Sequence, residues 1–204
     1  MSVLGQALDL LREGKPARLT QPNGDDEERL FAQAQLLTAK PVLYVCNVAE
    51  EDAANGNAMS EAVFAKAKAE GAQAVVVSAA IESELVAMEP DERTEYLADL
   101  GLSESGLSRV IRAGYELLGL KTFFTAGPKE ARAWTFPAGA RAPQAAGEIH
   151  TDFEKGFIRA ETIAYDDYVR LKGEQGAKDA GKMRLEGKEY VLRDGDVMHF
   201  RFNV

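Results

Sequence analysis

The sequence predicts a chain in two parts, an α/β unit with parallel strands followed by a smaller α+β unit. Apolar runs of strand length at 42–48 and 74–79 enclose a segment with helical character, which is typical of a βαβ unit. Strand character returns at 157–163 and again towards residue 204. The balance of acidic and basic residues also changes near residue 120, between these two groups of strands.

The length and composition restrict the class of protein. A chain of 204 residues holds one large or two small domains, each able to bury a core. It has no run of about 18 apolar residues and no basic-then-apolar leader, so we expect neither a membrane span nor secretion. Cys46 is the only cysteine, which excludes an internal disulfide and favours a cytoplasmic location.

The charge is distributed unevenly. Residues 1–120 carry 10 lysines and arginines against 20 aspartates and glutamates, whereas residues 121–204 carry 14 against 13. This change predicts a domain boundary near residue 120. The acidic first part is expected to repel nucleic acid, because binding depends on neutralising phosphates, so only the second part is suited to contact RNA.

The first 40 residues are expected to form two helices joined by a short loop, an antiparallel helix pair. Leu4, Leu8 and Leu11 share one face of the first helix, and Gly14 and Pro16 end it. The second helix opens with a run of polar and acidic residues from Asn23. Its buried stripe is predicted to consist of Leu30, Phe31, Ala34 and Leu37.

Residues 41–120 are predicted to form the α/β unit. The nearly continuous apolar run Val42–Val48 indicates a strand buried on both faces. A helix capped by Ser60 and ending at Gly71 connects it to a second buried strand at 74–79. The strands should be parallel, with a right-handed crossover. Pro90 and Ser103 lie near the starts of two further helices.

Residues 121–204 are predicted to form the α+β unit. The small and Gly-rich segment 144–147 suits a turn, and Phe157–Ile163 indicates a half-buried strand. Two runs with strand character flank Asp194-Gly195, which is typical of a tight hairpin turn. After that turn apolar and polar residues alternate, so this sheet should cover a core on one side only.

The second part also contains an ordered set of short motifs. They begin at Phe123 (FFTAG), Ala133 (AWT), Ala142 (APQAAG), His150 (HTDFEKGFI), Lys172 (KGEQGAK) and Asp194 (DGDV). In this order they resemble the carboxyl-terminal part of the YchF/Obg-like P-loop ATPase family. The resemblance implies that 1–40 is the end of a coiled-coil insertion and 41–120 a remnant of the nucleotide-binding α/β domain. It implies that 121–204 is a TGS domain, a ubiquitin-like β-grasp sheet wrapped on a helix.

Two segments of the α/β part resemble the base-recognition motifs of this family. They are Asn47-Val-Ala-Glu50, in the place of Asn-x-x-Glu, and Ser78-Ala79. The resemblance implies that adenine is contacted by Asn47, Val48, Glu50, Ser78 and Ala79. An asparagine amide offers both a donor and an acceptor to adenine. The alternative is that Asn47 is an ordinary turn residue and Ser78-Ala79 an ordinary strand end.

The family binds ATP with Mg²⁺ through a phosphate loop that this sequence lacks. Residues 176–182 fit G-x-x-x-x-G-K, but Met183 follows where a magnesium-binding Ser or Thr is needed. Since phosphoryl transfer needs a phosphate cradle, a lysine and a metal ligand, we expect this chain alone to be inactive as an ATPase. We also expect no tightly bound nucleotide, and we interpret 176–182 as a solvated basic loop.

The resemblance further implies contact with the ribosome or RNA through the TGS part. The residues suited to that contact are Arg170, Lys172, Lys178, Lys182, Arg184 and Lys188. The alternatives are that this segment is merely solvated, or that the chain is a stand-alone TGS interaction protein with no nucleotide role. His150 precedes Asp152, yet without a nucleophile it is interpreted as a hydrogen-bonding residue. The edge of strand 42–48 is expected to meet another chain, a symmetry mate or a repositioned helix.

Overall fold

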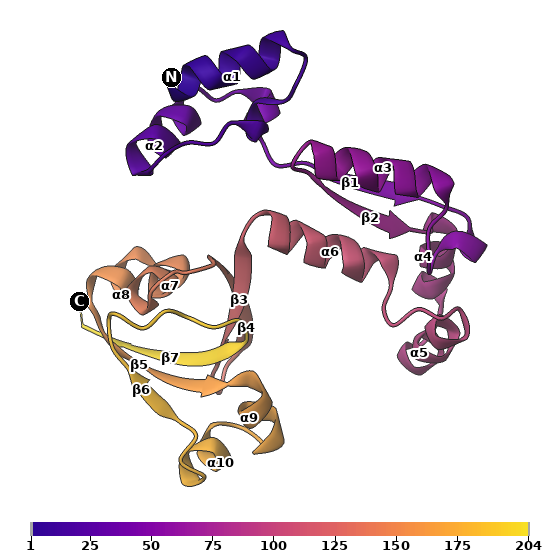
Figure 1. Cartoon of the computed structure of the whole chain (residues 1–204). Coiled ribbons are helices and arrows are strands. Elements are labelled where there is room, and N and C mark those ends of the chain that lie inside the picture. Colours follow the sequence, from indigo (N-terminus) through magenta and orange to yellow (C-terminus); the bar gives the residue numbers. More distant parts are fainter. Residues whose placement is uncertain (1, 204) are drawn as a thin grey trace. The chain divides into compact units, whose positions relative to one another are not determined.

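The computed structural model describes residues 2–203 and divides into two compact units, Met1–Leu118 and Gly119–Val204 (Figure 1). The division falls next to the change in charge near residue 120. Each unit has its own sheet, one of two strands and one of five. Within residues 2–203 no helix has both the length and the apolar character that a membrane span requires.

The first unit contains the predicted parallel strand pair. Strands β1 (Leu43–Asn47) and β2 (Gln73–Val77) pair in register from Leu43–Gln73 to Asn47–Val77. Helix α3 (Ala58–Ala69) connects them. Its N-cap is Asn57, so the prediction that Ser60 caps the helix was wrong. Ser60 instead occupies the third helical position and completes a capping box with Asn57.

The prediction that 42–48 is buried on both faces was also wrong. Val45 is 51% exposed, whereas Val75 and Val76 in β2 are buried. The reason is the size of the sheet, because burial of a strand on both faces requires neighbouring strands and helices that extend beyond it. Among residues 2–203 only β2 pairs with β1, so the other edge of β1 has no strand beside it.

Three helices follow β2, and one of them was not predicted. They are α4 (Ala79–Ala87), α5 (Pro90–Asp99) and α6 (Gly106–Leu117). Helix α4 begins directly after β2 in the run that was interpreted as a strand end. The N-cap of α6 is Ser105, two residues beyond the predicted Ser103. Ile81 and Leu85 of α4 pack with Ala53 in the small core of this unit.

The amino-terminal segment has helices α1 (Val3–Arg12) and α2 (Asp25–Gln33), which contact each other. The predicted buried stripe of α2 was wrong, since no residue of this helix is buried and Leu37, 80% exposed, lies beyond it. In α1 the buried residues are Val3 and Ala7 rather than the leucines. Short 3-10 turns occur at Ala17–Leu19, Leu37–Ala39 and Glu50–Asp52.

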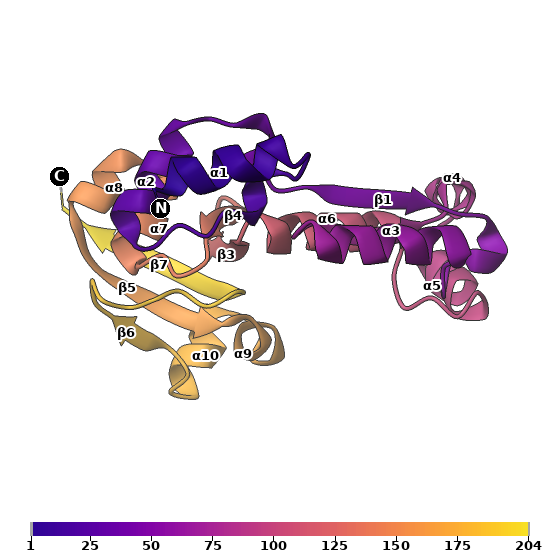
Figure 2. The same ribbon diagram turned by 45° about the horizontal axis from the view of Figure 1, so that its top comes forward.

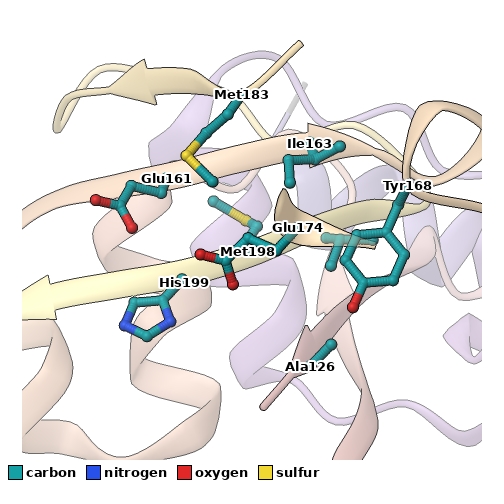
Figure 3. Close-up of a pocket in the computed structure, with 9 residues that line it drawn as sticks. Ala126, Glu161, Ile163, Tyr168, Glu174, Met183, Met198 and His199 are labelled. Carbon is teal, nitrogen blue, oxygen red and sulfur yellow. The ribbon is translucent and has the colours of Figure 1, made fainter. Parts of the chain in front are cut away.

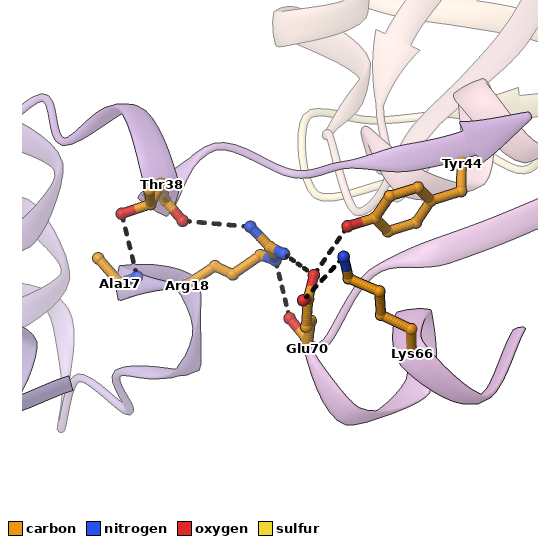
Figure 4. A network of polar contacts seen from close by, with 6 residues as sticks. All are labelled: Ala17, Arg18, Thr38, Tyr44, Lys66 and Glu70. Atoms are coloured by element: carbon orange, nitrogen blue, oxygen red, sulfur yellow. Dashed lines mark hydrogen bonds and ion pairs between the residues drawn. The ribbon is translucent and has the colours of Figure 1, made fainter. Parts of the chain in front are cut away.

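A polar network connects this helical segment to the α/β part (Figure 4). Arg18 donates from Nε to the carbonyl of Glu70 (2.7 Å) and from Nη2 to its carboxylate (2.8 Å). Tyr44 donates its hydroxyl to the same carboxylate oxygen at 2.8 Å. This hydrogen bond, followed by burial, raises the pKa of Tyr44. Glu70 at the end of α3 therefore holds the helical segment against β1 and α3.

The second unit is a five-stranded mixed sheet in the order β4-β3-β7-β5-β6 (Figure 2). Neighbouring strands are antiparallel except for the pair β3 and β7. The strands are β3 (Leu120–Ala126), β4 (Ala131–Pro137), β5 (Phe157–Ala164), β6 (Arg184–Glu186) and β7 (Asp196–Phe202). The helices are α7 (Ala142–Ile149), α8 (Thr151–Lys155), α9 (Tyr165–Arg170) and α10 (Glu174–Asp179).

The sheet and helix α7 enclose an aromatic core. Phe123 and Phe136 are fully buried, and the core also includes Phe157, Phe200 and alanines of α7. The strand at 157–163 is confirmed as β5, but 144–147 lies in α7 and not in a turn. Ala142, Ala145 and Ala146 of α7 are buried, because small side chains let the helix approach the sheet closely.

Two further predictions for this unit need correction. The run 189–193 is not a strand, although Val191 forms an isolated bridge with Arg141, and β7 pairs with β3 and β5 instead. The segment 176–182 is exposed from Lys178 to Lys182, as predicted, but it is not a loop throughout, since 176–179 lies in α10. Gly176 is required there because a Cβ would lie 2.0 Å from the carbonyl oxygen of Leu171. The positive φ expected at Gly195 is present, at 81°.

Candidate functional site

The predicted base-contacting residues of the two motifs meet at the carboxyl ends of β1 and β2. Asn47 ends β1, and its Oδ1 accepts a hydrogen bond from the backbone nitrogen of Ala79 at 2.9 Å. Ala79 is the first residue of α4. It follows Ser78, which lies directly after β2 and is the N-cap residue of α4. The asparagine side chain thereby joins two loops that lie 32 residues apart in the sequence.

This hydrogen bond leaves part of the Asn47 amide available. Its oxygen has a second lone pair, and its Nδ2 has two hydrogens with no partner among residues 2–203. Asn47 and Ala79 are exposed, while Val48 is half-buried and donates its backbone N–H to the carbonyl of Val77 at 2.9 Å. Glu50 is exposed at the start of the 3-10 turn that follows β1. The arrangement presents a donor, an acceptor and a carboxylate at one edge.

Ser78 has an unusual environment for a hydroxyl. The residue is only 1% exposed, and its Oγ has no hydrogen-bond partner among the described residues. An unsatisfied buried polar group costs about 1–3 kcal/mol. Such a group directly beside Asn47 and Ala79 is therefore a destabilising feature at the same edge where base contacts are expected.

Sequence reasoning missed the residues that support this edge. Glu82 in α4 accepts a hydrogen bond through Oε1 from the backbone nitrogen of Gly106 at 2.6 Å. A Cβ at Gly106 would lie 3.0 Å from that carboxylate oxygen and 3.1 Å from Val77, so the glycine permits α6 to start against β2. The only feature of the sequence that could have indicated this contact is Gly106, which directly follows Ser105, the N-cap of α6.

A second carboxylate of α4 contacts α5. Tyr96 donates its hydroxyl to Glu84. This hydrogen bond and then burial raise the pKa of Tyr96 to about 12, with a smaller contribution from the negative charge of Glu50. The hydrogen bond between Tyr96 and Glu84 thus connects α5 to α4.

The six predicted RNA-contacting residues fall into two groups. Arg170 forms an ion pair with Asp167, and Arg184 forms one with Asp196. The four lysines are exposed and have no ion pair among the described residues: Lys172, Lys178, Lys182 and Lys188. Lys172 has a φ of 60°, so the chain turns sharply there before α10. The lysines are available to a partner, whereas the arginines already have one.

Arg184 belongs to a network that holds 190–196 against β6. It donates to the hydroxyl of Tyr190 at 2.9 Å, and Tyr190 donates to Asp196, which is 2% exposed, at 2.7 Å. Burial, then the hydrogen bond and negative charge of Asp196, raise the pKa of Tyr190 to about 12. This network replaces the hairpin predicted around Asp194-Gly195, because Asp196 fixes the turn through its side chain.

A small cavity lies between β5, β7 and the helices α9 and α10 (Figure 3). Met183, Met198 and Tyr168 line it together with the side chains of Glu161 and His199. Its volume is about 10 Å³, which is room for roughly one water molecule. The cavity is therefore too small to be a ligand site, despite the carboxylate and imidazole at its rim.

His150 has a structural role. It is the N-cap of α8, and its Nδ1 accepts a hydrogen bond from the backbone nitrogen of Asp152 at 3.1 Å. This arrangement agrees with the interpretation of His150 as a hydrogen-bonding residue. Phe123, Phe136 and Phe157 are buried in the core of this unit, while Trp134 and Phe153 are partly buried beside it.

Comparison with known proteins identifies the family. Residues 120–203 match YchF-GTPase_C, a family described as "Protein of unknown function (DUF933)". The chain is 59% identical over 179 residues to the ribosome-binding ATPase YchF of Pasteurella multocida (strain Pm70), covering 88% of this chain and 49% of that protein. It is 53% identical over 204 residues to the protein of the same name from Haemophilus ducreyi (strain 35000HP / ATCC 700724), covering 100% and 56%.

A solved structure agrees with this result. The Schizosaccharomyces pombe YchF GTPase superposes with a TM-score of 0.81 at 34% identity, over 98% of this chain and 53% of that one. The chain spans about half the length of the curated relatives it matches. The chain therefore belongs to the YchF/Obg-like family and matches the carboxyl-terminal part of its members.

Proposed function

We propose that the first unit supplies the base-recognising edge of an adenine-nucleotide site, and that the second unit binds the ribosome, in a YchF-type ATPase. The hydrogen bond from Ala79 to Asn47 carries the first half of this proposal, because it joins both resembling motifs at one edge. In open α/β sheets, ligands bind outside the carboxyl ends of the strands, which is where these residues lie. Glu50, Val48 and Ser78 complete the proposed contacts.

The chemistry of the edge favours adenine over guanine. The Nδ2 of Asn47 can donate to a ring nitrogen, and the second lone pair of Oδ1 can accept from the exocyclic amine of adenine. Guanine has a carbonyl in place of that amine, so it would face the asparagine oxygen with another acceptor. Ser78 adds a buried hydroxyl without a partner in the described chain, which a bound base or its ordered water can satisfy.

The nucleotide triphosphate needs more than this edge. No segment of the sequence fits G-x-x-x-x-G-K-S/T, so nothing here matches the usual phosphate loop with its magnesium-binding hydroxyl. Base contacts alone give weak binding, and we expect a Kd on the order of 1 mM, which corresponds to a binding free energy of about −4.1 kcal/mol. We therefore expect weak binding of ATP by this chain and no phosphate release above background.

Amide chemical shifts provide the test at this affinity. Adding ATP to about the millimolar range should shift the amide signals of Val48, Ser78 and Ala79, and GTP should shift them less. Asn47→Asp retains the oxygen that accepts from Ala79 but removes the Nδ2 donor, so it should weaken the shifts caused by ATP without unfolding the chain. Equal shifts with both nucleotides, or no shifts at this edge, would contradict base recognition.

The second unit is proposed to contact the ribosome. The relatives carry the name ribosome-binding ATPase, and the four lysines named above are exposed and unpaired with carboxylates in the described chain. Co-sedimentation of the chain with ribosomes is expected at low salt and should weaken when all four lysines become glutamine. A glutamine variant that co-sediments as well as the unchanged chain would exclude these lysines as the contact.

The edge of β1 carries a proposal about assembly. Among residues 2–203 no strand pairs with this edge, Val45 beside it is exposed, and an open strand edge readily pairs with another strand. We propose that it associates with a second polypeptide, and sedimentation velocity over a concentration series tests self-association. If neither nucleotide nor self-association is detected, a TGS interaction protein without a nucleotide role becomes the better description.

A further inference from the structure

A groove opens in the second unit beside the turn that connects β3 to β4. Its volume is about 480 Å³, within the range of about 300–1,000 Å³ of small-ligand sites. The floor consists of Met198 and Phe200, which are core residues of β7. Its walls are formed by Trp134 of β4, Ile149 of α7 and Phe153 of α8, which are only partly buried. The groove is thus an opening to the aromatic core.

Trp134 is held in a fixed orientation at this groove. Its Nε1 donates to Oγ1 of Thr125 at 2.9 Å, and its ring stacks with Phe123 at 15° between the planes. The guanidinium carbon of Arg132 lies 4.1 Å from the centre of the Trp134 ring. Arg132 is exposed and forms no ion pair with any described residue. Arg132 therefore lies over the indole ring and remains exposed to solvent.

The charges around the mouth favour an anionic partner. Lys129 lines the groove from the β3–β4 turn, and Arg132 stands next to it, so two cations border an apolar and aromatic interior. Glu130 in the same turn is the carboxylate among the lining residues, and apart from Lys129 and Glu130 the lining side chains are neutral or imidazole. Nucleotides combine a flat base with an anionic phosphate, which is the complement of this surface.

We propose that this groove binds an unpaired nucleotide of single-stranded RNA, with the base beside Trp134 and Arg132 and the phosphate near Lys129. The inference rests on the proposed ribosome-binding function and names the RNA feature that the second unit recognises. Unstacked bases are recognised by stacking on aromatic side chains and arginine planes. An apolar peptide would fill the interior but would leave both cations without an anionic partner, so RNA is the better occupant.

Trp134 makes the test specific to the groove, because it is the only tryptophan in the chain. The full chain is titrated with an eight-nucleotide adenosine oligomer and, in parallel, with an RNA duplex, while tryptophan emission is recorded. We expect saturable quenching by the single strand and not by the duplex. Arg132→Glu should weaken binding at least tenfold, and Arg132→Lys, which keeps the charge but not the plane, by a smaller factor.

Arg159→Glu is the matched control, since it makes the same charge change at an exposed residue of β5 that does not line the groove. It should alter the binding constant less than twofold. The dependence of log K on log salt should become shallower by about 0.7 for each phosphate that a variant no longer neutralises. Equal weakening by Arg159→Glu and Arg132→Glu would overturn the proposal, because it would show non-specific attraction of RNA.

Ribosome co-sedimentation separates failure of this inference from failure of the proposed function. If the unchanged chain and Arg132→Glu co-sediment equally, the groove does not carry the contact, and ribosome binding itself stands. If the unchanged chain does not co-sediment, the proposed function fails. Quenching by an apolar peptide but not by RNA would overturn the inference in favour of a protein partner. Melting curves of each variant confirm that it is folded.

Discussion

The two units differ in how completely they bury their apolar side chains. In the first unit the core cluster contains Ala53, Ile81 and Leu85, while Val45 in β1 and Leu37 are largely exposed. In the second unit aromatic rings and alanines fill the space between a five-stranded sheet and α7. A sheet of two strands is too narrow to bury both of its faces beneath packed helices. The second unit thus buries an aromatic core, whereas the first leaves Val45 and Leu37 largely exposed.

The largest effect is expected when Phe123 is removed from the core of the second unit, since this weakens the better-packed of the two units. Phe123 is fully buried and its ring contacts those of Trp134, Phe136 and Phe200. Phe123→Ala should lower the free energy of unfolding of this unit by about 3–5 kcal/mol. Hydrogen exchange read separately for each unit measures this. Protection in the first unit should not change, and a parallel loss there would show that the units are coupled.

The next effect concerns the attachment of the helical segment in the first unit. Arg18 donates to both the carbonyl and the carboxylate of Glu70, and its side chain is only 11% exposed. Arg18→Ala should cost about 1.5–3 kcal/mol, the range for hydrogen bonds to charged groups. Urea denaturation followed by circular dichroism measures the loss.

The matched control for Arg18 is Arg12→Ala. Arg12 is exposed and pairs with Asp9 within the same helix at 3.7 Å, so its removal should change stability by less than about 0.5 kcal/mol. Equal effects of the two substitutions would mean that Glu70 does not anchor the helical segment.

A smaller effect of opposite sign is expected at Ser78. Its buried hydroxyl has no partner among the described residues, so Ser78→Ala should raise the free energy of unfolding of the first unit by about 1 kcal/mol. If the hydroxyl serves the nucleotide, the same substitution should weaken the shifts caused by ATP. A gain in stability together with a loss of binding would mark Ser78 as a functional residue, and a destabilised variant would contradict its unsatisfied state.

The smallest effect is confined to alkaline pH in the second unit. The pKa of Tyr190 in the folded chain is raised to about 12 from 10.0 by burial and by Asp196. The folded state therefore holds the proton more tightly, so this stabilisation is complete below pH 10.0 and is lost as the pH rises towards about 12. The difference in stability between the unchanged chain and Tyr190→Phe should shrink over that window. If the stability difference between the two proteins stays constant across that pH window, Tyr190 does not have a raised pKa in the folded chain.

Local patterns were sufficient for the parts of the fold that depend on neighbouring residues in the sequence. The apolar runs predicted β1, β2 and β5, and the glycines at 71 and 195 adopt the positive φ expected of a helix end and a turn. The motif order also identified the family. At the candidate site, the sequence named Asn47, Ser78 and Ala79, which the structure brings together.

Several of the errors share a physical cause, because they concern burial or contacts between distant segments. The sequence could not show that Val45 is exposed or that Arg184 contacts Tyr190 and Asp196. Nor could it reveal the groove at Trp134, since the residues that line it come from three strands, two helices and the β3–β4 turn.

The sequence by itself determined strands β1, β2, β5 and β7, helices α1, α2, α3, α5 and α6, and which family the chain resembles. Only the tertiary structure decided which side chains are free to bind. The oxygen of Asn47 accepts from Ala79 while its Nδ2 has no partner among the described residues, and Arg132 lies over the ring of Trp134 while remaining exposed. These outcomes depend on which atoms meet after folding, and no local pattern in the chain encodes that.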